Sequence, residues 1–200
     1  MNADELRTIL ARSFALLATS EDELRDLDAA VGDGDLGITV AGGSRAAQAA
    51  LSAMPATATI ADIFRGLGTT IAGANPSSFS ALAATGLLAA ARVAPTPLDR
   101  AALARVATDA VAAIAKRGKA ERGDKTVLDA LIPSIDAIEA GADLDGVIDA
   151  ARNGIEETRG GIAKRGRASW LAERSVGHAD PGAVAYLRFL EAFKRASAEE

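Results

Sequence analysis

Apolar residues recur every three or four positions along most of the chain, which is the spacing of one face of an α-helix. Leu6, Ile9, Leu10, Phe14 and Leu17 form the first of these stripes. Later stripes predict helices over residues 36–51, 60–71, 78–93, 103–118, 128–138, 144–162 and from 180 onward. We find no sustained alternation of apolar and polar residues, so we expect little or no sheet. The pattern predicts an all-α fold of about eight antiparallel amphipathic helices in one domain, residues 1–200.

Local signals set the ends of several of these helices. Pro55 closes the second, Ser77 or Ser78 caps the fourth, and Pro133 is expected to kink the sixth. Asp180-Pro181 is a strong start for the eighth, because a capping carboxylate precedes a proline at the first helical position. Residues 19–20 lead into a polar, acidic stretch to which we assign no helix.

Glycine gathers with charged residues in a few connections, at residues 31–37, 72–78, 117–126, 164–169 and 177–182. These segments follow the first, third, fifth and seventh predicted helices. Alternate connections of an up-and-down bundle lie at the same end. We therefore expect the glycine-rich loops to meet at one rim and to form a composite site.

The first of these loops holds three carboxylates, Asp28, Asp33 and Asp35, separated by glycines. Like charges this close favour a bound cation, and hard oxygen ligands suit magnesium or calcium. A solvated acidic loop is the alternative. An EF-hand is a poor match because its twelfth position, counted from Asp33, is Ser44 rather than glutamate.

The same loop matches a dinucleotide-binding pattern, G-x-G-x-x-G, at residues 32–37. That pattern has meaning only between a strand and a helix, and no strand is predicted here, so we reject it. A Walker phosphate loop is also absent from the sequence.

Basic residues are concentrated in the later loops and suggest a metal-bound polyphosphate, whose oxygens they would neutralise. They are Arg117, Lys119, Lys125, Lys164, Arg165, Arg167 and Arg174. Taken singly, each is explained as a solvated surface charge. We expect the His178 ring to tie two backbone segments together, Asp124 to cap the sixth helix, and Trp170 and Tyr186 to pack in the core or at the rim.

The amino-acid composition excludes several classes of protein and site. The 200 residues include 48 alanines, which favour helices, and no cysteine, which excludes disulfides and thiolate metal sites. The net charge of −5 argues against a nucleic-acid or anionic-membrane partner. The polar N-terminal segment lacks the pattern of a secretory signal, and no apolar run is long enough to cross a bilayer. We expect a cytoplasmic protein.

At these loops the sequence resembles the L subunit of dihydroxyacetone kinases. The matching stretches are residues 28–37, 117–126 and 166–183, and the likeness in spacing covers essentially the whole chain. The resemblance implies a closed eight-helix barrel that binds ATP or ADP with Mg²⁺ at one rim. It also implies a phosphotransferase that acts with a separate K subunit carrying dihydroxyacetone or a related short ketose.

The resemblance also implies roles for individual residues. Asp28, Asp33 and Asp35 would bind magnesium; Leu36, Gly37, Ile38 and Thr39 would lie against the phosphates; Gly118 and Val127 would line the base or ribose. Arg167 would pair with the nucleotide, and Asp180, Pro181 and Gly182 would close the pocket. Ser78 and Phe79 occupy positions of a phosphate-contacting loop.

The chain departs from the family pattern at two places. Leu36 stands where the family usually has histidine, and residues 75–80 replace a glycine-serine-glycine loop. These departures favour an alternative function, a non-catalytic nucleotide-binding regulator or adaptor with the same fold. A lipid-binding role is a further alternative, because alanine fills little volume and a barrel of small residues leaves room between its helices. The family also leaves two phosphoryl donors open, free ATP or a phosphocarrier protein that recharges bound ADP.

Overall fold

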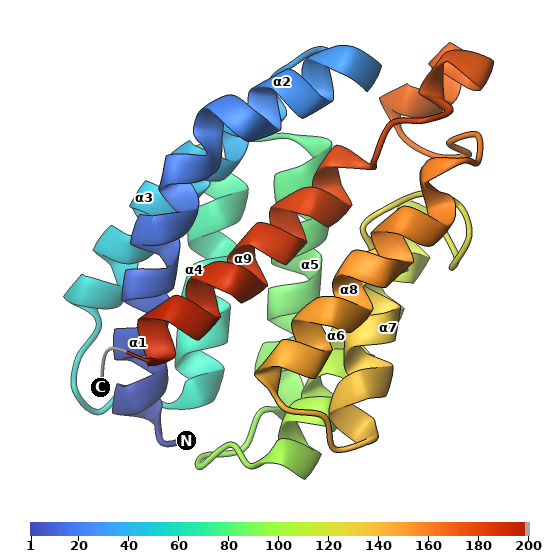
Figure 1. Ribbon diagram of the computed structural model, residues 1–200. Coiled ribbons are helices and arrows are strands. Elements are labelled where there is room, and N and C mark those ends of the chain that lie inside the picture. The colour runs from blue at the N-terminus through green and yellow to red at the C-terminus, as the bar shows by residue number, and fades with distance from the viewer. Residues whose placement is uncertain (199–200) are drawn as a thin grey trace.

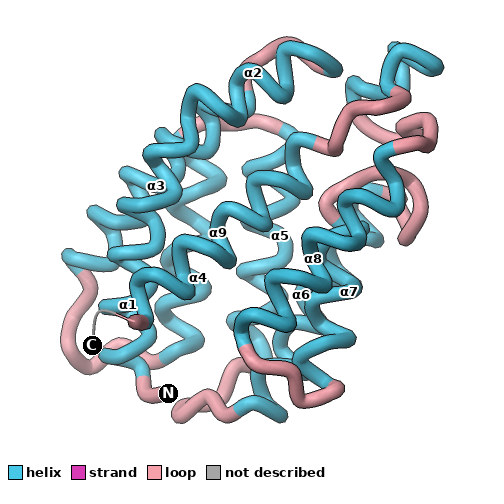
Figure 2. Tube along the Cα trace, viewed as in Figure 1, coloured by secondary structure: helices cyan, strands magenta, loops and turns pink. Residues whose placement is uncertain are grey.

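The computed structural model describes residues 1–198, and this part of the chain is helical without strands. Figure 1 shows the helices as long, roughly antiparallel rods, and Figure 2 shows the short connections between them. The all-α prediction is confirmed. The elements are α1 (Ala3–Leu17), η1 (Ala18–Ser20), α2 (Glu21–Val31), α3 (Leu36–Ala53), α4 (Ile60–Ala74), α5 (Ser78–Val93), α6 (Arg100–Gly118), α7 (Leu128–Glu139), α8 (Leu144–Arg159), η2 (Arg167–Ser175) and α9 (Pro181–Ser197).

Side-chain caps begin most of these helices where the sequence offers a short polar residue. Asn2, Thr59 and Ser77 form capping boxes at α1, α4 and α5. Asp180 accepts a hydrogen bond from the Ala183 amide at the start of α9, as predicted. Each such cap satisfies a backbone N–H that has no partner inside the helix.

Two predicted boundaries were wrong. The acidic stretch after residue 20 is the helix α2, in which a short apolar stripe of Leu24, Leu27 and Val31 stands among five acidic residues. At the other end, α8 stops at Arg159, because Gly160 and Gly161 follow it, and Ile162 lies exposed outside the helix.

The additional helix leaves the ends of the bundle unchanged. α2 continues upward from α1 through η1 in Figure 1, and α3 packs antiparallel against both of them. The two helices therefore act as one bent rod. The glycine-rich connections α2–α3, α4–α5, α6–α7 and α8–α9 consequently lie at one end, opposite the N-terminus.

The core runs through the middle of the bundle. Leu24, Leu51, Ile60, Ile63 and Leu67 are almost completely buried, and burying such a side chain contributes roughly 1.5–3 kcal/mol. Successive helices contact each other from α3 to α9, and α1 contacts both α3 and α9. The closed barrel remains a prediction.

Small residues set the closest helix contacts. A Cβ on Gly154 of α8 would lie 1.9 Å from the Asp129 carbonyl oxygen of α7, and a Cβ on Gly37 of α3 would lie 2.1 Å from the Glu21 carbonyl oxygen of α2. Only glycine permits these approaches. Within residues 1–198, no helix is both long and apolar enough to span a membrane.

Candidate functional site

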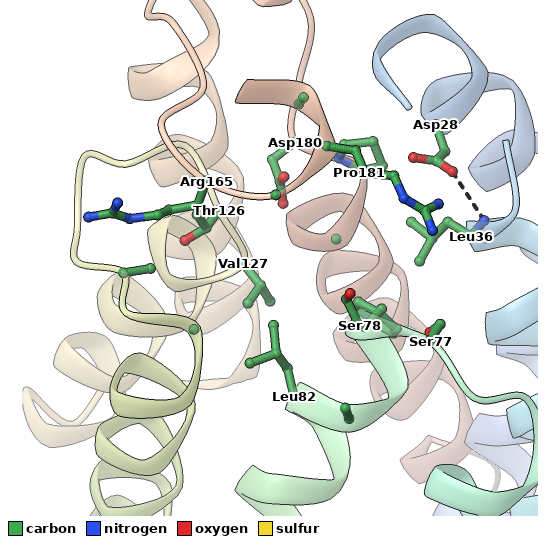
Figure 3. A pocket seen from close by; sticks show the side chains of 18 of the residues that line it. Asp28, Leu36, Ser77, Ser78, Leu82, Thr126, Val127, Arg165, Asp180 and Pro181 are labelled. Atoms are coloured by element: carbon green, nitrogen blue, oxygen red, sulfur yellow. Dashed lines mark hydrogen bonds between the residues drawn. The ribbon is translucent and has the colours of Figure 1, made fainter. Parts of the chain in front are cut away.

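A cavity of about 650 Å³ opens at the glycine-rich end, between the connections that the chain pattern predicts to meet there. Figure 3 shows it from close by, with Asp28 and Leu36 on one side, Thr126, Val127 and Leu82 on the other, and Asp180 and Pro181 between them. Its volume falls in the range of small-molecule sites, roughly 300–1,000 Å³. All four connections contribute residues to its lining.

The α2–α3 connection brings the three predicted metal ligands together. Carboxylate oxygens of Asp28, Asp33 and Asp35 lie within 4.8 Å of one another. Two glycines make this possible: a Cβ on Gly32 would lie 2.4 Å from an Asp28 carboxylate oxygen, and Gly34 has a φ of +77°.

Asp28 is the least exposed member of the trio and is oriented by the backbone. One of its oxygens accepts a hydrogen bond from the Leu36 amide at 3.2 Å, drawn as a dashed line in Figure 3. Burial raises the pKa of Asp28, and the nearby charges of Asp33 and Asp35 raise it further. The trio is therefore a concentration of negative charge that lacks full hydration.

A guanidinium from a distant part of the chain reaches this acidic loop. Arg167, at the start of η2, forms ion pairs with Asp33 and with Asp35, the latter at 3.3 Å. Arg167 and both carboxylates are each about half exposed. The pairing connects the α8–α9 connection to the α2–α3 loop across the mouth of the pocket.

The first turn of α5 forms another part of the wall. Ser77 and Ser78 line the pocket, and Ser77 is the cap, accepting from the Ser80 amide. Phe79 lies close to Gly182 at the start of α9, where an added Cβ would be 3.5 Å from the Phe79 ring. The hydroxyl groups of Ser77 and Ser80 are engaged in the capping box, so Ser78 offers the remaining hydroxyl on this turn.

The α6–α7 connection is held by buried charged side chains. Asp129 accepts from the Gly123 and Thr126 amides, at 2.5 and 2.7 Å. Lys125 is 4% exposed, and its ammonium donates to the carbonyls of Arg159, Gly161 and Ser175 at 3.0, 2.8 and 2.7 Å. Burial lowers the pKa of Lys125. This lysine joins the end of α8 to the end of η2 rather than facing a ligand.

Asp124 is also structural, but not as the predicted helix cap. Its buried carboxylate accepts from the Glu121 amide and pairs with Lys164 and Arg165 at 3.3 and 3.1 Å. These partners hold the pKa of Asp124 low against the opposing effect of burial. Arg165 accordingly points away from the space between the labelled pocket residues in Figure 3. α7 begins at Leu128, and its N-cap residue, Val127, makes no side-chain capping hydrogen bond.

Asp180 is the most strongly perturbed acid in the pocket. Burial is the main cause that raises its pKa to about 7, and the charges of Asp129 and Asp28 add to the effect. The hydrogen bond from the Ala183 amide and the charge of Lys125 oppose it. This side chain therefore titrates near neutral pH.

Most of the predicted site residues line this one pocket: Asp28, Asp33, Asp35, Leu36, Ser78, Phe79, Gly118, Val127, Arg167, Asp180, Pro181 and Gly182. Gly37, Ile38 and Thr39 do not. Thr39 is buried, Ile38 is largely exposed, and Gly37 is packed against α2. Sequence reasoning did not anticipate the apolar wall of Leu82, Ile114 and Leu128, which comes from ordinary core-like positions that carry no separate signal.

Three other expectations have clear outcomes. The prediction that the His178 ring ties two segments together was wrong: the residue is exposed, and among residues 1–198 its side chain makes no hydrogen bond. Trp170 on η2 is 83% exposed and does not pack. Tyr186 is partly buried against the core and shares a hydrogen bond with Ser134 at 2.8 Å.

Comparisons with known proteins place these features in context. The model of the DAK2 domain family matches residues 30–195. The ADP-binding subunit DhaL of PEP-dependent dihydroxyacetone kinase 1 from Listeria innocua is 36% identical over 80% of this chain and 79% of its own length. L-erythrulose 1-kinase from Mycolicibacterium smegmatis is 35% identical over 95% of this chain and 35% of its length.

Solved structures agree with the sequence relatives. The crystal structure of the dihydroxyacetone kinase from C. freundii in complex with AMP-PNP and Mg²⁺ superposes with a TM-score of 0.75 at 27% identity. The match covers 97% of this chain and 33% of that one. The chain thus spans about a third of the length of this larger kinase.

Proposed function

The chain belongs to the DAK2 domain family, and we propose that it is the nucleotide-binding subunit of a dihydroxyacetone-kinase-like phosphotransferase. In this proposal the single domain of residues 1–200 holds ATP or ADP with Mg²⁺, and the phosphoryl group passes to a short ketose on a separate K subunit. The observation that carries the proposal is one pocket that combines a carboxylate trio, an apolar wall and the start of two helices.

The carboxylate trio fits a divalent cation. Asp28, Asp33 and Asp35 supply oxygen atoms, the ligand type that magnesium requires, and their mutual repulsion calls for positive charge. Arg167 already supplies part of that charge. Asp28, Asp33 and Asp35 would hold the ion, which when bound would supply positive charge against the charge that develops during phosphoryl transfer.

The rest of the pocket fits a nucleotide. Val127, Leu82, Ile114 and Gly118 all line the pocket and give it an apolar wall suited to the base or ribose. Ser78 and Phe79, in the first turn of α5, line the cavity, and helix N-termini favour phosphate groups. Asp180, Pro181 and Gly182 close the third side. Because catalysis of phosphoryl transfer is mostly positioning and charge neutralisation, these groups are sufficient without a nucleophile on this chain.

The names of the relatives guide the choice of donor and acceptor. The Listeria relative is PEP-dependent and binds ADP, which supports recharging of bound ADP by a phosphocarrier protein. The Mycolicibacterium relative acts on L-erythrulose and is about three times as long, which makes erythrulose an acceptor to test beside dihydroxyacetone. Bound nucleotide that survives purification and exchanges slowly would support the phosphocarrier donor, and rapid exchange with ATP would support direct transfer.

The central test is calorimetric binding of ADP, with and without Mg²⁺, to the wild type and to Asp33→Ala. We expect the substitution to weaken magnesium-dependent ADP binding at least about tenfold, roughly 1.4 kcal/mol. Asp26→Ala is the matched control, because Asp26 is an exposed carboxylate on α2 that pairs only with Arg25 among the described residues. Undiminished ADP affinity in Asp33→Ala would remove the metal assignment.

A second cavity favours the lipid-binding alternative enough to test it. Its volume is about 430 Å³, and it lies between α6, α7, α8 and α9 with a lining that includes Val111, Ile135, Val147 and Phe189. Native mass spectrometry of the purified protein would reveal a retained lipid. Phosphorylation of dihydroxyacetone or erythrulose after addition of a matching K subunit would exclude a purely non-catalytic role.

A further inference from the structure

Arg167 pairs with two of the carboxylates that a bound cation would neutralise. Its guanidinium pairs with Asp33 and Asp35, two members of the carboxylate trio, although it is 132 residues from Asp35 along the chain. All three side chains are about half exposed. Exposed ion pairs are individually weak, so this pairing exchanges partners at little cost. A guanidinium binds carboxylate and phosphate oxygens with the same geometry.

The segment that carries Arg167 has a fixed base and a turn directly beside this residue. Lys125 joins the carbonyls of Arg159 and Ser175, at the two ends of the segment. The Gly177 amide donates to the Arg159 carbonyl at 2.9 Å and strengthens the same junction. Gly166, immediately before Arg167, has a φ of +68°. The Arg167 side chain can therefore change partners while the base of the segment stays in place.

We propose that Arg167 is an internal counter-ion that makes nucleotide binding conditional on the divalent cation. This inference rests on the proposed function. Without the cation, Arg167 is engaged by Asp33 and Asp35 and is withheld from phosphate groups. When the cation neutralises these carboxylates, the guanidinium is released and becomes available to the phosphate oxygens. Arg167 thus selects the metal-bound nucleotide over the free one.

The proposal predicts two effects of opposite sign from one substitution. Arg167→Gln removes a competitor for Asp33 and Asp35, so Mg²⁺ alone should bind more tightly, by roughly threefold, the size expected of exposed ion pairs. The same substitution removes a phosphate partner, so ADP in the presence of saturating Mg²⁺ should bind about tenfold more weakly. A residue that only contacts phosphate would leave the affinity for Mg²⁺ alone unchanged, and a simple surface ion pair would leave the affinity for ADP unchanged.

Trp170 provides a readout of the segment itself. It is the only tryptophan in the chain, lies three residues after Arg167 on η2 and is 83% exposed. Titrating Mg²⁺ alone into the wild type should change Trp170 fluorescence, because release of Arg167 alters the surroundings of η2. In Arg167→Gln the cation should bind without this change. Sodium chloride at equal ionic strength corrects for screening.

Arg174→Gln is the matched control, since Arg174 is exposed on the same segment and makes no ion pair among residues 1–198. Both affinities should stay at wild-type values in this variant. Equal gains in Mg²⁺ affinity from both substitutions, or no gain from Arg167→Gln, would overturn the inference. Failure of the wild type to bind Mg²⁺ and ADP would instead refute the proposed function.

Discussion

Asp180→Asn tests whether burial in the pocket keeps this carboxyl protonated at neutral pH. Asparagine has the same shape and is also a good N-cap, so its side-chain oxygen can still accept from the Ala183 amide at the start of α9. The substitution therefore removes the titration while preserving the hydrogen bond. Any difference from the wild type that varies with pH reports the ionisation of Asp180.

The magnitude follows from the raised pKa, which moves from 3.8 to about 7. Between these values the folded chain retains a proton that the unfolded chain has lost, so the free energy of unfolding falls as pH rises. Each pKa unit corresponds to about 1.4 kcal/mol, so the loss in the free energy of unfolding above pH 7 is at most about 4 kcal/mol. The pocket is open to water, and this exposure makes the realised loss smaller.

The assay is urea unfolding of both proteins in the presence of a chelator, from about pH 5 to about pH 8. The variant should become more stable relative to the wild type by up to about 1.4 kcal/mol per pH unit, and the difference should level off above about pH 7. Asp143→Asn is the control, because Asp143 caps α8 from an exposed position at the other end of the bundle.

A stability difference between Asp180→Asn and the wild type that stays flat from about pH 5 to about pH 8 would refute the burial argument. The same holds if Asp143→Asn reproduces the profile, because the effect would then belong to N-cap carboxylates in general. A slope confined to lower pH would mean that Lys125 and the Ala183 amide outweigh burial in setting the pKa of Asp180.

Two substitutions test the framework around the site by urea unfolding. Lys125→Met leaves three carbonyls, of which that of Ser175 is buried, without their charged donor and should cost about 2–4 kcal/mol. Trypsin should also cut residues 160–176 faster, and unchanged cleavage would contradict a fixing role for Lys125. Gly154→Ala forces α8 away from the Asp129 carbonyl and should cost about 3 kcal/mol. Gly73→Ala, where an added Cβ meets nothing within 4 Å, should be neutral or slightly stabilising, and equal losses in the two variants would contradict the close-contact argument.

Local signals were sufficient for most of the fold. The apolar stripes and the caps at Ser77 and Asp180 placed the helices correctly, because both depend on residues close together in the sequence. α2 escaped detection because its apolar stripe, Leu24, Leu27 and Val31, is short and stands among acidic residues. The one-rim prediction nevertheless survived, because α2 continues the direction of α1.

Charges were harder to interpret from the sequence. The trio of Asp28, Asp33 and Asp35 was recognisable because the three residues are close in the sequence and the glycines between them let the chain bring their carboxylates together. Basic residues in the later loops looked equivalent, yet Lys125 is buried against carbonyls and Arg165 pairs with Asp124. Their roles differ because each depends on which distant backbone or carboxylate lies nearest after folding.

The sequence by itself determined the helices, the loops that carry the chemistry and the family that they resemble, since these are properties of short segments. Only the tertiary structure decided which charged side chains form ion pairs with each other. It paired Arg167 with Asp33 and Asp35, and it buried Asp180 enough to raise its pKa to about 7. The physical reason is that Coulomb energies and desolvation depend on distances and burial across the whole chain, which no local pattern encodes.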